Sequence, residues 1–188
     1  MPNHQTVMYD SAERYGLVSR VLHWSVAALI LWQIVGMALK LILGRQPLAA
    51  FFVGLHQPIG AILFVLIVLR TGWAFLNRGN RPDHGSGLLA RAARLGHGFI
   101  YVLMLAVPAL GLLRAYGSER GFAPFGVQIF APRQEPVAWM VEAGSLLHGE
   151  LAWLLAAVIL GHVLMVAVHE RMLRDGTLSR MLGRRGKA

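Results

Sequence analysis

The sequence predicts an all-α integral membrane protein, a four-helix bundle whose N- and C-termini both lie in the cytoplasm. Three observations predict this fold class. The 188 residues are 56% hydrophobic and have a mean hydropathy of +0.54, a composition unlike that of a soluble domain. Four apolar stretches each reach the length of about 20 residues that a membrane-spanning helix needs. Basic residues are divided unequally between the connections, which sets the orientation.

The composition also excludes several classes of protein. The chain has no cysteine, so disulfides, Cys-ligated zinc, iron–sulfur clusters and covalently attached haem are excluded. A net charge of +9 would suggest nucleic acid in a soluble protein, but here most arginines flank apolar spans and no nucleic-acid motif accompanies them. We therefore expect no nucleic-acid partner and a single membrane domain over residues 1–188.

The four predicted transmembrane helices cover about residues 21–43, 48–76, 91–114 and 142–169. The second helix contains Pro58 and Gly60, and the third contains Pro108. Such residues are tolerated within the membrane when neighbouring helices satisfy the freed backbone groups. Residues 1–20 lack the apolar core of a cleaved signal peptide, so the first helix is expected to act as an uncleaved anchor.

Basic residues set the expected orientation. The N-terminal segment, the link after the second helix and the C-terminal tail together hold thirteen lysines and arginines, and the other connections hold five. Because loops rich in Lys and Arg stay in the cytoplasm, both termini are expected there. The chain is thus predicted to be a multi-pass protein of the bacterial inner membrane.

Two histidines interrupt the fourth apolar stretch. His148 and His162 are fourteen residues apart, which is about four helical turns and about 21 Å of rise, so both point to the same side. Imidazoles inside a membrane are costly and mark functional sites. Since haem iron accepts histidine as an axial ligand, this helix is expected to contact two stacked haems.

Orientation assigns each remaining histidine a depth. His56 and His148 are the two that lie in the outer half, so they are the expected ligands of an outer haem. The inner level offers more candidates than a haem needs: His23, His97, His162 and, about 10 Å lower, His169. The spacing alone leaves open whether His23 or His97 is the partner of His162. A single histidine in a membrane often only forms a hydrogen bond with a neighbouring helix. Two pairs of histidines at matching depths favour haem ligation instead.

Four segments resemble the bacterial cytochrome b561 family: SRVLHWSVAAL, GLHQPIGAILFVLIVLR, LARAARLGHGFIYVLMLAVPALGLL and LHGELAWLLAAVILGHVLMVAVHE. The resemblance extends from about residue 14 to 185. Its most specific features are the HW pair in the first helix, the LGHxxIY start of the third, and the GH that follows the first histidine of the fourth by fourteen residues. The chain departs from the family pattern in having LHGE where WHE is common.

The resemblance implies a small four-helix protein with two non-covalent haem b groups. It assigns His23 and His162 to the inner haem iron, and His56 and His148 to the outer one. Members of the family pass electrons between the membrane faces and quinone. One known activity is that of a superoxide oxidase, which oxidises superoxide at the periplasmic face and reduces ubiquinone. Expected partners are therefore membrane lipid, quinone, and superoxide or another small electron donor.

Several points stay open at the level of sequence. His97 and His169 are possible quinone-site residues, although simple hydrogen bonding is the more ordinary role for both. No catalytic residue is assigned. The candidate partners of the haem propionates are Arg20, Arg78 and Arg94 on the inner side and Lys40 and Arg114 on the outer side.

Two other functions are compatible with the pattern. The chain resembles haem b electron-transfer or anchor subunits of hydrogenase- or dehydrogenase-type respiratory complexes, which share this fold. A helical bundle with no redox role, whose histidines only form hydrogen bonds, is the third reading. The pairing of histidines at two depths argues against this third function.

Overall fold

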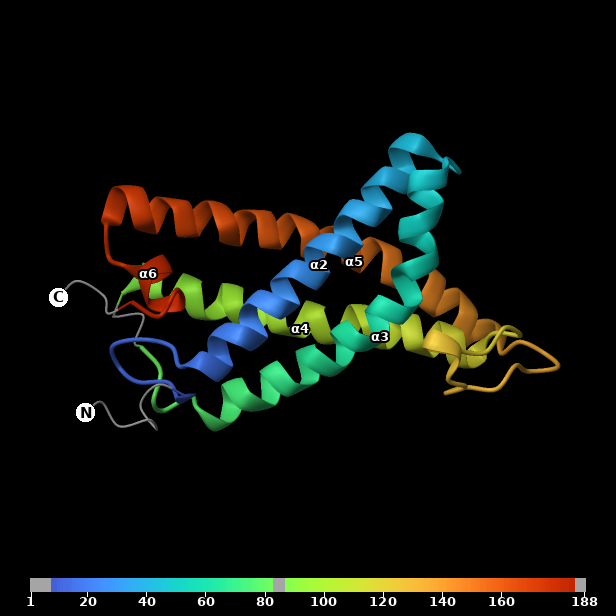
Figure 1. Cartoon of the computed structure of the whole chain (residues 1–188), viewed down its shortest axis with the longest axis horizontal. Coiled ribbons are helices and arrows are strands. Elements are labelled where there is room, and N and C mark those ends of the chain that lie inside the picture. The colour runs from blue at the N-terminus through green and yellow to red at the C-terminus, as the bar shows by residue number, and fades with distance from the viewer. Residues whose placement is uncertain (1–7, 83–86, 185–188) are drawn as a thin grey trace. The chain divides into compact units, whose positions relative to one another are not determined.

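A computed structural model of the chain describes residues 8–82 and 87–184. Four long helices dominate it (Figure 1). They are α2 (Leu17–Leu43), α3 (Pro47–Leu76), α4 (Leu88–Gly117) and α5 (Ala138–Val168). Each is long and apolar enough to cross a membrane, so the predicted all-α fold class with four spanning helices is confirmed. The cytoplasmic placement of the termini and the single membrane domain over residues 1–188 stay predictions.

The four long helices start one to four residues earlier than the sequence predicted. α2 begins at Leu17 and α5 at Ala138. Pro58 lies inside α3 and Pro108 inside α4 without ending either helix, as expected for membrane helices. Gly44 follows the last residue of α2; it has a φ of 63° and donates its backbone N–H to the carbonyl of Lys40 at 3.0 Å. A glycine in this left-handed conformation is a common helix end.

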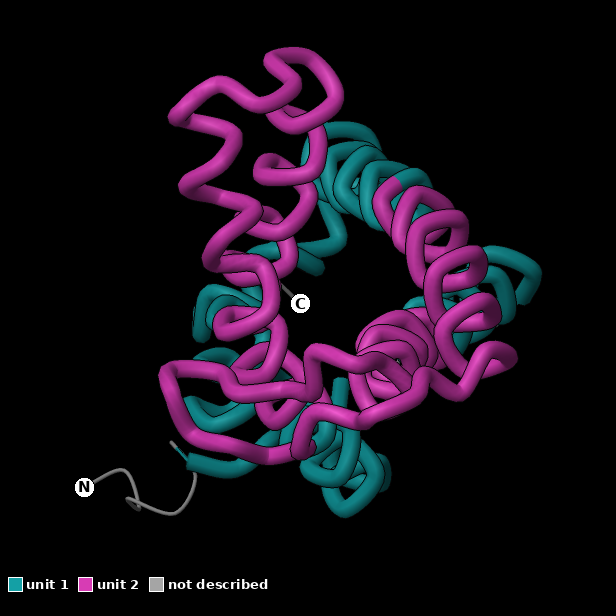
Figure 2. Tube along the Cα trace, turned by 90° about the vertical axis from the view of Figure 1, so that its right-hand side faces the viewer, with its two compact units in different colours: residues 1–25, 68–101, 157–188 teal, residues 26–67, 102–156 magenta. Residues whose placement is uncertain are grey.

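The described residues form two compact units (Figure 2). Unit 1 comprises the described parts of Met1–Ser25, Val68–Tyr101 and Ala157–Ala188, and unit 2 comprises Val26–Ile67 and Val102–Ala156. Each of the four long helices therefore contributes one part to unit 1 and the other part to unit 2. Among the described residues, unit 2 holds most of the buried apolar side chains, including Val26, Ile30, Leu63, Ile67, Leu103, Met104, Val107 and Leu155.

A buried carboxylate organises the N-terminal part of unit 1. Asp10 is 6% exposed and accepts hydrogen bonds from the backbone N–H of Gly16 and the hydroxyl of Ser19, each at 2.8 Å. It also pairs with Arg81 Nε at 3.1 Å. Trp73 in α3 donates its indole N–H to the Ser19 oxygen at 2.9 Å. These bonds join the N-terminal segment to α2, to α3 and to the link after α3.

The C-terminal segment of unit 1 folds back onto the start of α2. After α5 the chain makes one π-helical turn, η2 (His169–Leu173), and then α6 (Thr177–Met181). Arg20 Nη1 donates to the carbonyl of Leu182 at 3.1 Å, and Arg14 Nη1 donates to that of Gly183 at 3.3 Å. The residues after α6 are therefore joined to the N-terminal part of the same unit by arginine–backbone hydrogen bonds.

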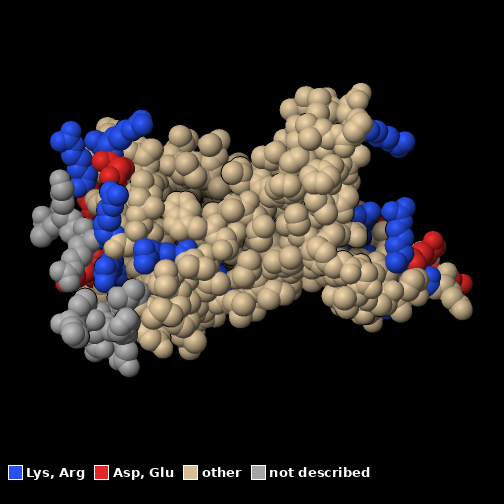
Figure 3. All heavy atoms as spheres, in the orientation of Figure 1, with Lys and Arg blue, Asp and Glu red and all other residues tan. Residues whose placement is uncertain are grey.

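The connection between α4 and α5 in unit 2 is compact. It contains the short helix η1 (Pro124–Gly126) and a β-bridge between Phe122 and Phe130. Arg133 donates to the carbonyl of Tyr116 at 2.7 Å and lies over its ring. On the face shown in Figure 3, charged side chains lie near loops and helix ends, and uncharged residues cover the helix lengths. Large exposed apolar side chains such as Leu41 and Leu160 are what a lipid-facing surface requires.

The Asp10 network gives a stability prediction. In Asp10→Asn the fold keeps its shape but loses the charged acceptor for Arg81 and Ser19, so we expect the free energy of unfolding to fall by about 1–3 kcal/mol. Thermal unfolding of the detergent-purified protein measures this. Glu135→Gln, at an exposed position in the α4–α5 connection, is the control and should unfold at the wild-type temperature. Equal midpoints for the two variants would contradict the prediction.

Candidate functional site

The first histidine pair lies in unit 2. His56 in α3 and His148 in α5 face each other with ring centroids 5.9 Å apart and ring planes at 82°. Both side chains are partly buried. The structure therefore brings together the two residues that the sequence assigned to one depth.

A backbone hydrogen bond fixes the orientation of His148. Its Nδ1 lies 2.8 Å from the carbonyl oxygen of Val107 in α4. Because a carbonyl only accepts hydrogen bonds, Nδ1 must carry the proton, and the lone pair is left on Nε2. Metal-binding histidines are held in this way, with the second ring nitrogen bonded to a carbonyl or carboxylate. His148 is thus prepared to bind a metal through Nε2.

A glycine makes room for that hydrogen bond. Gly111 lies one turn after Val107 on α4, on the same side of the helix. A Cβ atom at Gly111 would lie 3.1 Å from both Cε1 and Nδ1 of the His148 ring, which is closer than ordinary van der Waals contact. A side chain at this position would therefore force the imidazole to shift away from the Val107 carbonyl by a few tenths of an ångström.

A side-chain amide positions the backbone at His56. Gln33 in α2 donates its Nε2–H to the His56 carbonyl at 2.9 Å. A Cβ at Gly60 would lie 3.3 Å from the same amide nitrogen, so this glycine also gives the contact space. The exposed ammonium of Lys40 is close enough to interact electrostatically with the His56 ring. Unit 2 therefore combines two facing imidazoles, their positioning groups and one nearby cation.

The second histidine group lies in unit 1. His97 in α4 and His162 in α5 have ring centroids 5.3 Å apart and planes at 75°. His97 donates Nδ1–H to the Ala93 carbonyl at 2.7 Å. His23 in α2 interacts electrostatically with both, and its ring contacts Trp24 edge-on at 5.1 Å. Three of the four inner candidates of the sequence are gathered, and His97 is the direct neighbour of His162.

His169 has a different environment. It lies in the π-turn η2, and its Nδ1 is 2.5 Å from Oδ2 of Asp175. Thr177 donates both its backbone N–H and its hydroxyl to Oδ1 of that carboxylate. Burial raises the pKa of Asp175, but the hydrogen bonds from Thr177 and His169 outweigh burial and lower this pKa below its usual value. Asp175 is therefore an ionised acceptor at neutral pH, and it orients His169.

These arrangements fit haem better than a free metal ion. Among residues 8–82 and 87–184, no three His, Asp or Glu side chains form a group that could hold a metal ion. Haem iron needs only axial ligands from the protein, because the porphyrin fills the other positions. Metal–imidazole bonds of about 2.0–2.1 Å, as zinc shows, place two ring centroids roughly 6 Å apart across the metal. The 5.9 Å separation of His56 and His148 matches this requirement.

Sequence reasoning missed several groups that surround the histidines. The Val107 carbonyl, Gly111 and Gln33 carried no recognisable signal in the sequence, because their role depends on which helices are neighbours. Arg70 in α3 was also missed, although its charge inside an apolar stretch was a visible signal. Its guanidinium lies 5.7 Å from the centre of the Tyr101 ring.

The expected propionate partners on the inner side have other contacts in the structure. Arg20 bonds the Leu182 carbonyl, and Arg78 lies over the Phe75 ring. Arg94 is exposed.

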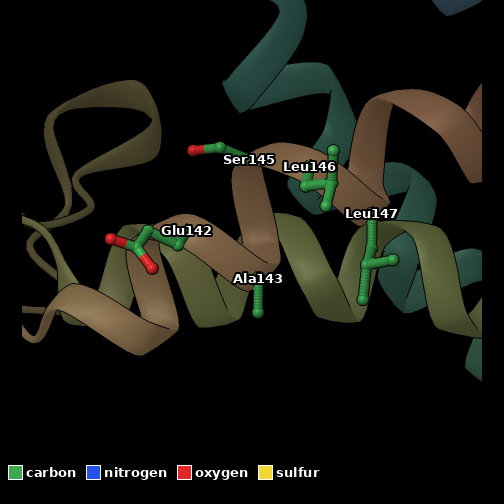
Figure 4. A pocket seen from close by; sticks show the side chains of 5 residues that line it. All are labelled: Glu142, Ala143, Ser145, Leu146 and Leu147. Carbon is green, nitrogen blue, oxygen red and sulfur yellow. The ribbon is translucent and has the colours of Figure 1, made fainter.

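A shallow hollow on α5 is not part of either histidine group. Figure 4 shows the five side chains that line it: Glu142, Ala143, Ser145, Leu146 and Leu147. All come from two successive turns of one helix, and Glu142 and Ser145 point away from the neighbouring helices. The hollow is an indentation along an exposed helix surface.

Comparison with known proteins agrees with the resemblance seen in the sequence. A family model described as prokaryotic cytochrome b561 matches residues 14–184. The chain is also similar to cytochrome b561 homolog 2 of Escherichia coli (strain K12). The two are 29% identical over 185 residues, which cover 93% of this chain and 94% of the relative.

The contact between Gly111 and His148 gives a second prediction. In Gly111→Ala the added methyl group displaces the imidazole and breaks its bond to Val107. Loss of such a partner weakens metal binding by about 10–100-fold. We expect the purified variant to lose haem held between His56 and His148, measured as haem per chain and as a change in the reduced-minus-oxidised spectrum.

Gly149→Ala is the matched control, because it lies next to His148 on α5 but has no atom within 4 Å of an added Cβ. This variant should keep the wild-type haem content. If Gly111→Ala also keeps it, the close approach does not position the ligand.

Proposed function

We propose a function for this chain on the basis of its family. The chain belongs to the prokaryotic cytochrome b561 family, whose members are haem b proteins that transfer electrons in the membrane. Within that role, we propose that this chain holds two haem b groups in the bacterial inner membrane. It oxidises superoxide at the periplasmic face and reduces ubiquinone, as a superoxide oxidase. The observation that carries this proposal is the pairing of histidines within each unit.

The proposed ligands are His56 and His148 in unit 2, and His23 and His162 in unit 1. α5 supplies one histidine to each unit. The facing rings of His56 and His148 and the bond from His148 to Val107 support the first pair. The gathering of His23 and His97 around His162 supports the second, and the family resemblance selects His23.

Haem supplies one-electron chemistry when bound. With two histidines on each iron, no axial position is left for a substrate, so the electron transfers are outer-sphere. Two superoxide anions give up two electrons and become two molecules of dioxygen. One ubiquinone takes those two electrons and two protons and becomes ubiquinol. The protein's tasks are to attract the anion, to position the haems and to deliver protons to the quinone.

Unit 2 has features suited to the superoxide side. All five basic residues that the sequence places on the outer side lie in this unit: Lys40, Arg45, Arg114, Arg120 and Arg133. Lys40 interacts electrostatically with His56. A positive potential near an electron acceptor raises the encounter rate of a small anion.

Unit 1 has features suited to the quinone side. Among the described residues it contains eleven lysines and arginines, which supports a cytoplasmic location for this end. His169, oriented by Asp175, and His97 are the titratable groups proposed to bond a quinone carbonyl or deliver protons to it. Unchanged ubiquinone turnover in His169→Ala would exclude this role for His169.

The first test is a haem count on the purified full-length protein, with spectra of single variants. We expect two low-spin haems per chain in wild type, and one in each of His56→Ala, His148→Ala and His162→Ala. Each of these variants lacks one imidazole ligand, so the haem at that site should be lost. The remaining haem keeps both of its ligands and should keep its own absorption band. His23→Ala and His97→Ala separate the two possible inner pairs: we expect haem loss in the former and two haems in the latter.

The opposite result for His23 and His97 would assign His97 as the ligand. Protein that binds no haem when made with ample haem would defeat the proposed function altogether. Protein with two haems that does not reduce ubiquinone with superoxide would favour an electron-transfer subunit of a larger complex.

Lys40 provides a test of the superoxide side. In Lys40→Gln we expect the second-order rate constant for haem reduction by superoxide to fall by about two- to tenfold at low ionic strength, because a steering charge is removed. The difference should shrink as salt screens the charge. Stopped-flow spectroscopy measures both effects, and Arg120→Gln is the control for an exposed cation of the same unit. Equal slowing in the two variants would show a general charge effect with no role specific to Lys40.

A further inference from the structure

Arg70 places a positive charge among the apolar residues of α3. Its side chain is mostly buried, and it forms a hydrogen bond with the side chain of Tyr101 and lies over the Tyr101 ring. A buried guanidinium is costly unless an anion compensates for its charge. Among the described residues, no carboxylate forms an ion pair with Arg70.

The aromatic neighbours do not supply the missing negative charge. Burial raises the pKa of the Tyr15 phenol, against the opposing effect of the Arg81 charge. Tyr15 is therefore neutral at physiological pH. Tyr101 serves Arg70 as a hydrogen-bond partner and as a ring surface, and a cation–π contact of this kind offsets only part of a lost hydration shell.

The buried carboxylate of the same unit, Asp10, is already paired. Arg81 lies close enough to interact with Arg70, and Asp10 is paired with Arg81 and with the donors of Gly16 and Ser19. The cluster thus has two guanidinium groups and one carboxylate among the described residues. One positive charge is left over, and it belongs to Arg70.

This surplus charge lies beside the histidine group of unit 1. Arg70 interacts electrostatically with His23, His97 and His162. We propose that Arg70 binds a propionate carboxylate of the haem held in unit 1, with Tyr101 orienting the guanidinium. The inference rests on the proposed function, because it requires a haem at these histidines.

The chemistry of the partners favours a carboxylate supplied with the haem. A planar guanidinium matches the geometry of a carboxylate, with two parallel N–H···O bonds. Haem b carries two propionates on the edge of a ring whose iron the histidines would hold, so the anion and the metal arrive together. An anionic lipid phosphate is the other source of negative charge, and the experiments below separate the two.

The first experiment is a redox titration of the holoprotein in wild type, Arg70→Gln, Arg70→Lys and Arg91→Gln. A cation beside a haem favours the reduced form, which carries one more electron. We expect one haem of Arg70→Gln to titrate at a lower potential than in wild type, or to be lost. The other haem, in unit 2, should titrate as in wild type and show that the protein is folded.

The two other variants test charge and location. Arg70→Lys should keep the haem and most of its potential, because the charge remains. Arg91→Gln removes an exposed cation of the same unit, and both of its haems should titrate as in wild type. Identical titrations for Arg70→Gln and wild type would overturn the inference, as would equal shifts in Arg70→Gln and Arg91→Gln.

The second experiment identifies the anion. Full-length protein made without haem is reconstituted with haem b or with its dimethyl ester, which has no free carboxylates. We expect wild type to bind the free acid more tightly than the ester at the unit 1 site, and this preference to shrink in Arg70→Gln. An equal preference in both proteins would overturn the inference. A loss of this preference in Arg70→Gln that appears only when anionic phospholipids are supplied would also overturn the inference. That result would identify lipid as the source of the negative charge beside Arg70.

The two proposals fail in different ways. If the chain binds no haem, the proposed function fails. If it binds two haems through the assigned histidines and Arg70 affects neither, only the inference fails.

Discussion

The hydrogen bond from His148 to the carbonyl of Val107 is the interaction on which the unit 2 site depends. It sets the tautomer of His148, whose ring lies 5.9 Å from that of His56 between centroids. The close approach of the imidazole to α4 is accommodated by the glycine at position 111. A membrane helix thus contributes to the candidate metal site through a carbonyl and a missing methyl group.

The same constraint explains the other polar groups along the spans. In lipid, a polar group without a partner is costly, and several described polar groups along the spans have specific ones. Gln33 bonds the His56 carbonyl, His97 bonds the Ala93 carbonyl, and Trp73 bonds Ser19. Two of these bonds involve a histidine next to another histidine. Polar residues along these helices are therefore concentrated where they orient the candidate ligands.

Charge is distributed by the same logic. Unit 1 pairs its buried Asp10 with Arg81 and leaves Arg70 over the ring of Tyr101. A cation beside a group of imidazoles is an arrangement suited to an anionic cofactor with a metal centre. Unit 2 presents its cations at exposed positions such as Lys40 and Arg120, where they affect diffusing ions more than stability.

The sequence by itself determined the fold class and predicted the histidines of the candidate site. Four apolar stretches, the absence of cysteine and the fourteen-residue spacing of His148 and His162 were enough to predict spanning helices and histidine pairs, because helix length and period follow from local sequence. Tertiary structure alone decided which groups orient the ligands and which arginine lacks an anion. Val107, Gly111, Gln33 and Arg70 act across helix contacts, and the side of a neighbouring helix that a residue meets is set by packing. For the same reason the sequence left the partner of His162 open, and the structure places both His23 and His97 beside it.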